Sequence, residues 1–109
     1  MAIKGNTYSR STLQATRVLG SQIAQARRAR RMPLAEFAQR VGVSEPTARN
    51  IERGLPSVAI GTVFEAARIV GLSLFTEDPR ALASLVQRGE EQLALLPSRV
   101  RARKVKDDF

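Results

Sequence analysis

The sequence contains neither cysteine nor histidine, and these two absences remove much of the usual chemistry of protein sites. Without cysteine the chain can form no disulfide and no thiolate metal site, and without histidine the commonest proton shuttle is missing. Between residues 36 and 91 the acidic residues show no paired or metal-ligand spacing beyond two adjacent doublets, which fit better as charges at helix ends. We therefore expect no enzyme activity, no catalytic residues, no metal and no cofactor.

Aromatic residues and long apolar runs are also scarce. Tyr8 and four phenylalanines are too few and too scattered for a platform that stacks single-stranded nucleic acid. No apolar run is long enough for a membrane span, and the first ten residues, MAIKGNTYSR, lack the apolar segment of a secretory signal. These absences predict a cytoplasmic protein. Since 43% of the residues are apolar, the sequence also predicts one small core.

Acidic residues are missing altogether from the first part of the chain. Residues 1–31 carry seven Lys or Arg and no Asp or Glu, residues 32–96 are close to neutral, and residues 97–109 carry five Lys or Arg against two Asp. Basic residues bind DNA phosphates without sequence preference because they release condensed counterions. The run from Arg27 to Arg31 directly precedes a candidate helix pair, which favours phosphate contact over a merely solvated helix face.

Apolar residues recur at helical spacing along most of the chain, with no strand pattern and no internal repeat. Asp78 followed by Pro79 is a start signal for the last helix, and we expect Gly89 to interrupt that helix. The spacing predicts helices over residues 11–31, 33–41, 45–53 and 60–70, and a fifth from Pro79 onward. On the first helix, the expected inward residues are Leu13, Val18, Leu19, Ile23, Ala24 and Ala26.

The expected architecture is therefore all-α. It comprises a disordered lead-in over residues 1–10, a five-helix domain over residues 11–96 and a basic tail over residues 97–109. Gly20 weakens the first helix by about 1 kcal/mol relative to alanine.

Residues 33–54, PLAEFAQRVGVSEPTARNIERG, predict two short helices joined by a glycine-centred turn. Pro33 is expected at the first position of one helix, which Gly42 ends through a left-handed conformation. The Ser44 hydroxyl is expected to cap the next helix, and Gly54 to end it. Such a pair presents its second helix to DNA.

The second helix of this pair has one polar side. Arginine can bind O6 and N7 of guanine, and asparagine N6 and N7 of adenine, so Arg49 and Asn50 suit base readout in the major groove. Glu45 could accept a hydrogen bond from cytosine N4 or simply favour the positive end of the helix. Thr47 could reach a phosphate or pack. The exposed stripe consists of Glu45, Pro46, Arg49, Asn50 and Arg53.

Residues 19–75 resemble the helix-turn-helix domain of the Cro/repressor class, the XRE family, in the segments LGSQIAQARRARRM, LAEFAQRVGVSEPTARNIERG and PSVAIGTVFEAARIVGLSL. This resemblance implies a lambda-repressor-like fold and an ion pair between Arg27 and Glu52. Leu34 replaces the glutamine that usually caps the second helix and contacts a phosphate, and Pro46 is unusual in a reading position. The expected DNA contacts are Glu45, Pro46, Arg49 and Asn50 on bases, and Arg27, Arg28, Arg31, Ser44, Thr47 and Arg53 on phosphates.

The end of the chain, LPSRVRARKVKDDF after a DPRALASL helix, resembles small HipB-like antitoxins encoded beside HipA-like serine/threonine kinase toxins. The resemblance implies a repressor of its own type II toxin-antitoxin operon, with Arg101, Arg103 and Phe109 docking on the kinase. The tail could instead be a free end that adds nonspecific DNA affinity. An XRE-family regulator of a prophage or restriction system, with no toxin partner, would share residues 19–75. A basic RNA-binding or nucleoid protein is a further alternative.

We also expect a homodimer on the operator in the protein's own promoter, because one recognition helix reads only about half of a double-stranded site. The apolar residues left for this contact could instead complete the core of the monomer. They are Leu74, Phe75, Leu82, Leu85 and Val86.

Overall fold

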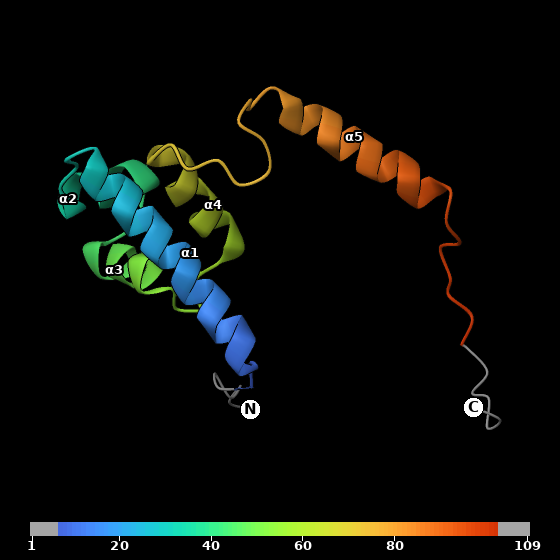
Figure 1. Cartoon of the computed structure of the whole chain (residues 1–109), viewed down its shortest axis with the longest axis horizontal. Coiled ribbons are helices and arrows are strands. Elements are labelled where there is room, and N and C mark those ends of the chain that lie inside the picture. Colours follow the sequence, from blue (N-terminus) through green and yellow to red (C-terminus); the bar gives the residue numbers. More distant parts are fainter. Residues whose placement is uncertain (1–6, 103–109) are drawn as a thin grey trace. The chain divides into compact units, whose positions relative to one another are not determined.

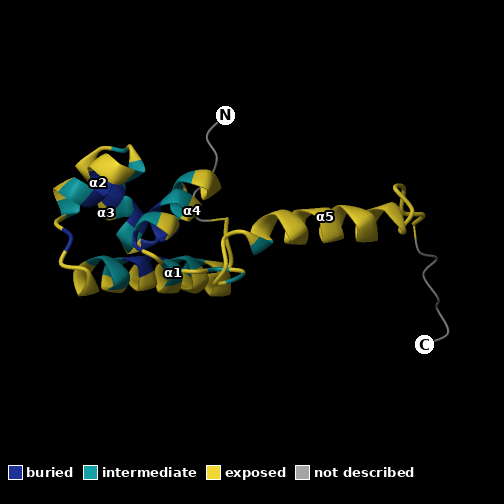
Figure 2. Cartoon of the chain, turned by 90° about the horizontal axis from the view of Figure 1, so that it is seen from above, coloured by how far each residue is buried: buried dark blue, intermediate teal, exposed yellow. Residues whose placement is uncertain are grey.

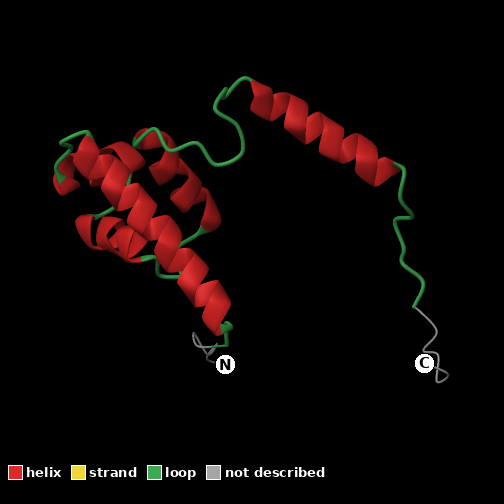
Figure 3. Ribbon diagram, in the orientation of Figure 1, coloured by secondary structure: helices red, strands yellow, loops and turns green. Residues whose placement is uncertain are grey.

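The computed structural model describes residues 7–102, which form five helices and no strand (Figures 1 and 3). The all-α prediction is therefore confirmed over the described part of the chain. The chain divides into two compact units, one that ends at Leu74 and one that begins at Phe75. The helices are α1 (Arg10–Ala29), α2 (Leu34–Val41), α3 (Glu45–Arg53), α4 (Ile60–Ile69) and α5 (Ala81–Ala94).

The ends of α1 are set by a serine cap and by a left-handed residue. The Ser9 hydroxyl accepts a hydrogen bond from the Thr12 amide at 3.2 Å, so α1 begins one residue earlier than expected. Most of the predicted lead-in lies outside the described residues. Arg31 has a φ of 55°, and α1 ends before it. Pro33 is the N-cap of α2 rather than its first residue, because its ψ of 154° is extended.

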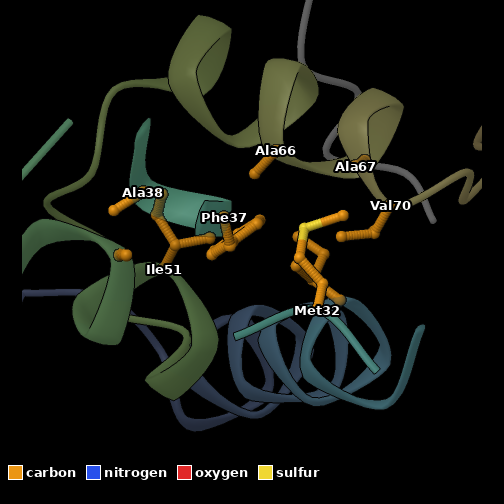
Figure 4. Packing of buried hydrophobic residues seen from close by; sticks show 9 residues of the cluster. Met32, Phe37, Ala38, Ile51, Ala66, Ala67 and Val70 are labelled. Atoms are coloured by element: carbon orange, nitrogen blue, oxygen red, sulfur yellow. The ribbon is translucent and has the colours of Figure 1, made fainter. Parts of the chain in front are cut away.

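One apolar core lies among α1, α2, α3 and α4 (Figures 2 and 4). Phe37, Ile23 and Val70 are its largest fully buried side chains. Leu74 packs against this core. Of the two alternatives predicted for Leu74, a dimer contact or a place in the core of the monomer, the structure has the second. Val18, expected inward, is 57% exposed, because it lies about 140° around the helix from Ile23. The buried core consists of Ile23, Met32, Phe37, Ala38, Ala48, Ile51, Ala66, Ala67 and Val70.

The backbones of α1 and α3 touch where α1 crosses the end of α3. A Cβ atom added to Gly20 would lie 2.6 Å from the Ile51 carbonyl oxygen and 2.6 Å from the Gly54 nitrogen. A Cβ atom on Gly54 would overlap the backbone of Thr16. Gly20 thus allows a close crossing of two helices, a role beyond the expected weakening of the first helix.

The unit that begins at Phe75 contains α5, whose boundaries differ from those predicted. The Asp78 carboxylate accepts a hydrogen bond from the Arg80 amide at 3.0 Å, so a turn precedes the helix and α5 begins at Ala81 rather than at Pro79. The predicted interruption at Gly89 is wrong, and α5 runs through this residue to Ala94. A glycine inside a helix costs about 1 kcal/mol relative to alanine and does not by itself break the helix.

Candidate nucleic-acid interface

The turn between α2 and α3 is built by Gly42 and Ser44. Gly42 has a φ of 88° and donates its amide to the Ala38 carbonyl at 2.9 Å, which ends α2. The Ser44 hydroxyl accepts from the Thr47 amide at 3.2 Å and donates to the Thr47 hydroxyl oxygen at 3.1 Å. Both predicted caps are confirmed, and the two hydroxyl groups expected near phosphates lie together at the exposed start of α3.

The buried face of α3 fixes which side of the helix meets solvent. Ala48 and Ile51 are 0% and 2% exposed, and both belong to the core that also holds Phe37 of α2. Pro46 lies in the first turn of α3, where a missing amide hydrogen costs nothing. Glu45, Arg49 and Arg53 are exposed and repeat every four residues, so they form one stripe along the outer side of α3.

Glu45 and Arg49 form an ion pair across one turn of that stripe, with 3.8 Å between Oε1 and Nη2. Both residues were expected on bases, and their pairing was not predicted, although a glutamate four residues before an arginine is the favourable order on a helix. Both side chains are about half exposed, and such a pair contributes only about 0.3–0.5 kcal/mol. The pair therefore holds Arg49 along the helix at rest and can be opened by a stronger partner.

Asn50 and Arg53 complete the outer side of α3. Asn50 is half-buried, and its backbone carbonyl oxygen accepts from the Leu55 amide at 3.1 Å. Arg53 is exposed and makes no ion pair with any other described residue. Its guanidinium is available to a ligand at the end of the helix.

The ion pair implied between Arg27 and Glu52 is present and ties α1 to α3. The Arg27 Nε atom lies 2.5 Å from Glu52 Oε2, and Nη2 lies 3.1 Å from Oε1. Arg27 Nη1 also donates to the Met32 carbonyl at 2.8 Å, just before α2 begins. Both side chains of the pair are 11% exposed. Because all three guanidinium nitrogens donate inside the protein, these bonds favour a structural role for Arg27 over the expected phosphate contact.

The other arginines at the end of α1 have different surroundings. Arg28 and Arg31 are exposed and have no acidic partner among residues 7–102. The guanidinium of Arg30 lies against Gly71, just after the last turn of α4, because an added Cβ atom there would overlap it. A cation is favoured near the carbonyl end of a helix. Of this basic run, Arg28 and Arg31 are the cations left for a phosphate.

All four carboxylates between residues 7 and 74 already have an arginine partner within 4 Å. Arg68 donates to Glu65 at 2.6 Å, and this hydrogen bond holds the pKa of Glu65 below its ordinary value. The remaining arginines of the unit leave it with an excess of unpaired positive charge, which suits a polyanion. The four pairs are Arg27 with Glu52, Arg40 with Glu36, Arg49 with Glu45, and Arg68 with Glu65.

A cleft of about 610 Å³ lies where α1 passes the end of α3. Its sides come from the first half of α1, from the end of α3 and from the segment that follows α3. It is lined by Leu13, Thr16, Arg17, Glu52, Arg53, Gly54, Leu55 and Pro56.

Residues 23–75 match the family model described as Helix-turn-helix. The chain thus carries a helix-turn-helix domain, the class of domain found in DNA-binding transcriptional regulators. It is of the XRE type, with α2 and α3 as the helix pair. No curated protein and no solved structure gives a significant match to the chain.

No helix within residues 7–102 is long and apolar enough to cross a membrane. Over the same residues, no group of three His, Cys, Asp or Glu side chains could hold a metal ion. Of the residues expected to dock on a partner, Arg101 is exposed and lies outside any helix, while Arg103 and Phe109 fall outside the described part of the chain.

Proposed function

We propose that this protein is a transcriptional repressor that recognises a specific DNA sequence by placing α3 in the major groove. One observation carries the proposal: α3 has a buried face fixed by Ala48 and Ile51, and an outer face that presents Arg49 and Asn50. The Arg27–Glu52 pair ties α3 to α1. A rigid helix with bidentate donors on its outer side is what base readout needs.

The proposed roles of the outer residues follow from their chemistry. Arg49 leaves Glu45 to bind a guanine, and Asn50 binds an adenine. Glu45, once released, can accept from a cytosine, and Pro46 can contact only the methyl group of a thymine. The proposed phosphate contacts, which set register rather than sequence choice, are Arg28, Arg31, Ser44, Thr47 and Arg53.

We propose that two copies pair through α5. Leu82, Leu85 and Val86 are 44%, 38% and 62% exposed and recur at a spacing of three to four residues. A helix of 14 residues with this stripe is only marginally stable alone in water. Pairing two stripes would cover them and would place two α3 helices on one operator. Leu74 is no longer part of the proposed contact, because it packs against the core.

The proposed biological role is that of a HipB-like antitoxin which represses its own operon and binds a HipA-like kinase. The exposed apolar residues of α5 and the basic segment after it, including Arg101, support a protein-binding role for this end of the chain. The helix-turn-helix domain alone would serve a prophage or restriction regulator equally well. Binding to a HipA-like kinase therefore distinguishes the antitoxin from a regulator without a toxin partner.

The first experiment measures DNA recognition by fluorescence anisotropy. The full chain is titrated against its own promoter duplex and against a shuffled duplex of the same length and composition. We expect the promoter to bind about a thousandfold more tightly or better. Equal affinity for the two duplexes would contradict sequence-specific repression and favour a nonspecific nucleoid or RNA-binding protein.

Two further experiments test the partners. Analytical ultracentrifugation should show a dimer that Leu85→Glu dissociates, whereas Leu95→Glu, just after the last residue of α5, should leave the dimer intact. A strict monomer on DNA would overturn the pairing. Calorimetry with a HipA-like kinase encoded in the same operon should show binding that a chain ending at residue 96 loses. Unchanged affinity would refute tail docking, and no binding by the full chain would favour the toxin-free regulator.

A further inference from the structure

The cleft beside the end of α3 is lined by two arginines from different elements. Arg17 comes from the first half of α1, and Arg53 is the last residue of α3. Leu13, Leu55 and Pro56 give the cleft an apolar part. Two guanidinium groups that line one cleft suit a small anionic group, because hydrogen bonds between arginine and a phosphate are charge-assisted and strong.

No described carboxylate pairs with either of these two arginines. Glu52 also lines the cleft, but both of its carboxylate oxygens accept hydrogen bonds from Arg27. Neither Arg17 nor Arg53 is within ion-pair distance of any described carboxylate. The Thr16 hydroxyl donates to the Leu13 carbonyl at 2.9 Å and is not available to a ligand. The cleft therefore has a net positive charge that nothing in the described chain neutralises.

The position of the cleft points to DNA as the source of the anion. Arg53 follows Arg49 by four residues and lies on the same outer stripe of α3. The segment between α3 and α4, residues 54–59, contains no charged residue. A DNA strand that passes the end of α3 would find its nearest cations in the cleft.

We propose that Arg17 and Arg53 together bind one phosphate of the DNA backbone in this cleft. Arg17 lies outside residues 23–75, the part that matches the helix-turn-helix family, so the extended first half of α1 becomes part of the DNA interface. This proposal rests on the proposed function. Arg17 adds affinity for any duplex and no choice of sequence, because it contacts only the backbone.

The test is the salt dependence of DNA binding. The variants Arg17→Gln, Arg17→Lys and Arg68→Gln are titrated with the promoter duplex and the shuffled duplex at several salt concentrations. Arg17→Gln should weaken both complexes by about three- to tenfold and lower the slope of log K against log salt by about 0.9, the value for one phosphate. Arg17→Lys keeps the charge and should keep the slope. Arg68→Gln removes the same charge from α4 and should leave the slope unchanged.

A second measurement uses the absence of cysteine in the chain. An iron–EDTA reagent attached to Arg17→Cys should cleave the backbone of the promoter duplex at a few neighbouring positions, and the same reagent on Arg68→Cys should not. A wild-type slope for Arg17→Gln, an equal slope change for Arg68→Gln, or no cleavage from position 17 would overturn the cleft proposal. The proposed function fails separately, if the wild-type chain binds both duplexes equally.

Discussion

Replacing Gly20 with alanine tests whether the close crossing of α1 and α3 holds the DNA-binding helix in place. In an isolated helix this change would stabilise the protein by about 1 kcal/mol, since alanine is the better helix former. In this fold the new Cβ atom would meet three backbone atoms at 2.6–2.7 Å, namely Gly54 N, Ile51 O and Glu52 O. Backbone atoms cannot rotate away as a side chain can, so the two helices must move apart.

The size of the effect follows from these opposing terms. Relief of the overlap requires contacts of 2.6 Å to lengthen toward an ordinary 3.4 Å, which would also loosen the Arg27–Glu52 pair. Overpacking costs about 1–3 kcal/mol. We take the upper end of this range here, because the atoms that the new Cβ atom meets are backbone atoms. After the helix gain is subtracted, we expect a net loss of about 2 kcal/mol. For a domain of this size the loss lowers the melting temperature by roughly 8–16 °C.

The assay is thermal and urea unfolding followed by far-ultraviolet circular dichroism. Gly61→Ala in α4 is the matched control, because nothing lies within 4 Å of its added Cβ atom. It should be as stable as the wild type or more stable, by up to about 1 kcal/mol. If Gly20→Ala proves as stable as Gly61→Ala, the backbone contact between α1 and α3 does not constrain the fold and the reasoning is refuted.

Three other perturbations have defined outcomes. Arg27→Ala should lower the free energy of unfolding by about 3 kcal/mol, because it leaves Glu52 unpaired at 11% exposure, while the ratio of promoter to shuffled affinity stays the same; a changed base preference would contradict a purely structural role. Ser44→Ala should cost about 1 kcal/mol in urea unfolding through loss of the α3 cap, and an unchanged midpoint would show that the cap is dispensable. The pKa of Glu65 is lowered mainly by its hydrogen bond from Arg68, so the pair stabilises the fold above the unfolded pKa of Glu65 and this contribution is lost as the pH falls through the folded value. Arg68→Gln should raise the pKa of Glu65 in an NMR titration, and an unmoved titration curve would disprove the assignment.

Local signals in the sequence were sufficient for the helix pair. Gly42, Ser44 and Gly54 stand where the chain needs a left-handed residue, a side-chain cap and another left-handed residue, and their backbone angles and hydrogen bonds match. These requirements are set within a few residues, so they can be read without knowing the rest of the fold. The bounds of α3 were predicted to the residue for this reason.

Features that depend on packing between elements were harder to predict. Gly20 and Gly89 are both glycines inside helices, yet Gly20 meets the backbone of α3 while the added Cβ atom of Gly89 would meet nothing within 4 Å. The residues around each glycine in the sequence do not reveal this difference, because it depends on which part of the fold packs against the glycine. The cleft that brings Arg17 beside Arg53 arises from the same crossing of α1 over α3. The Glu36–Arg40 and Glu45–Arg49 pairs, by contrast, carried a local signal, their spacing of four residues.

The central claim is that α3 reads bases through its outer face, and Arg49→Ala tests it most directly. Anisotropy titrations of this variant should show a loss of about 1–3 kcal/mol on the promoter duplex, relaxed choice at one base pair, and nearly unchanged affinity for the shuffled duplex. Arg40→Ala is the matched control, since Arg40 pairs with Glu36 across one turn of α2 as Arg49 does with Glu45 on α3. An equal loss on both duplexes for Arg49→Ala, or an equal loss of discrimination for Arg40→Ala, would contradict base recognition by α3.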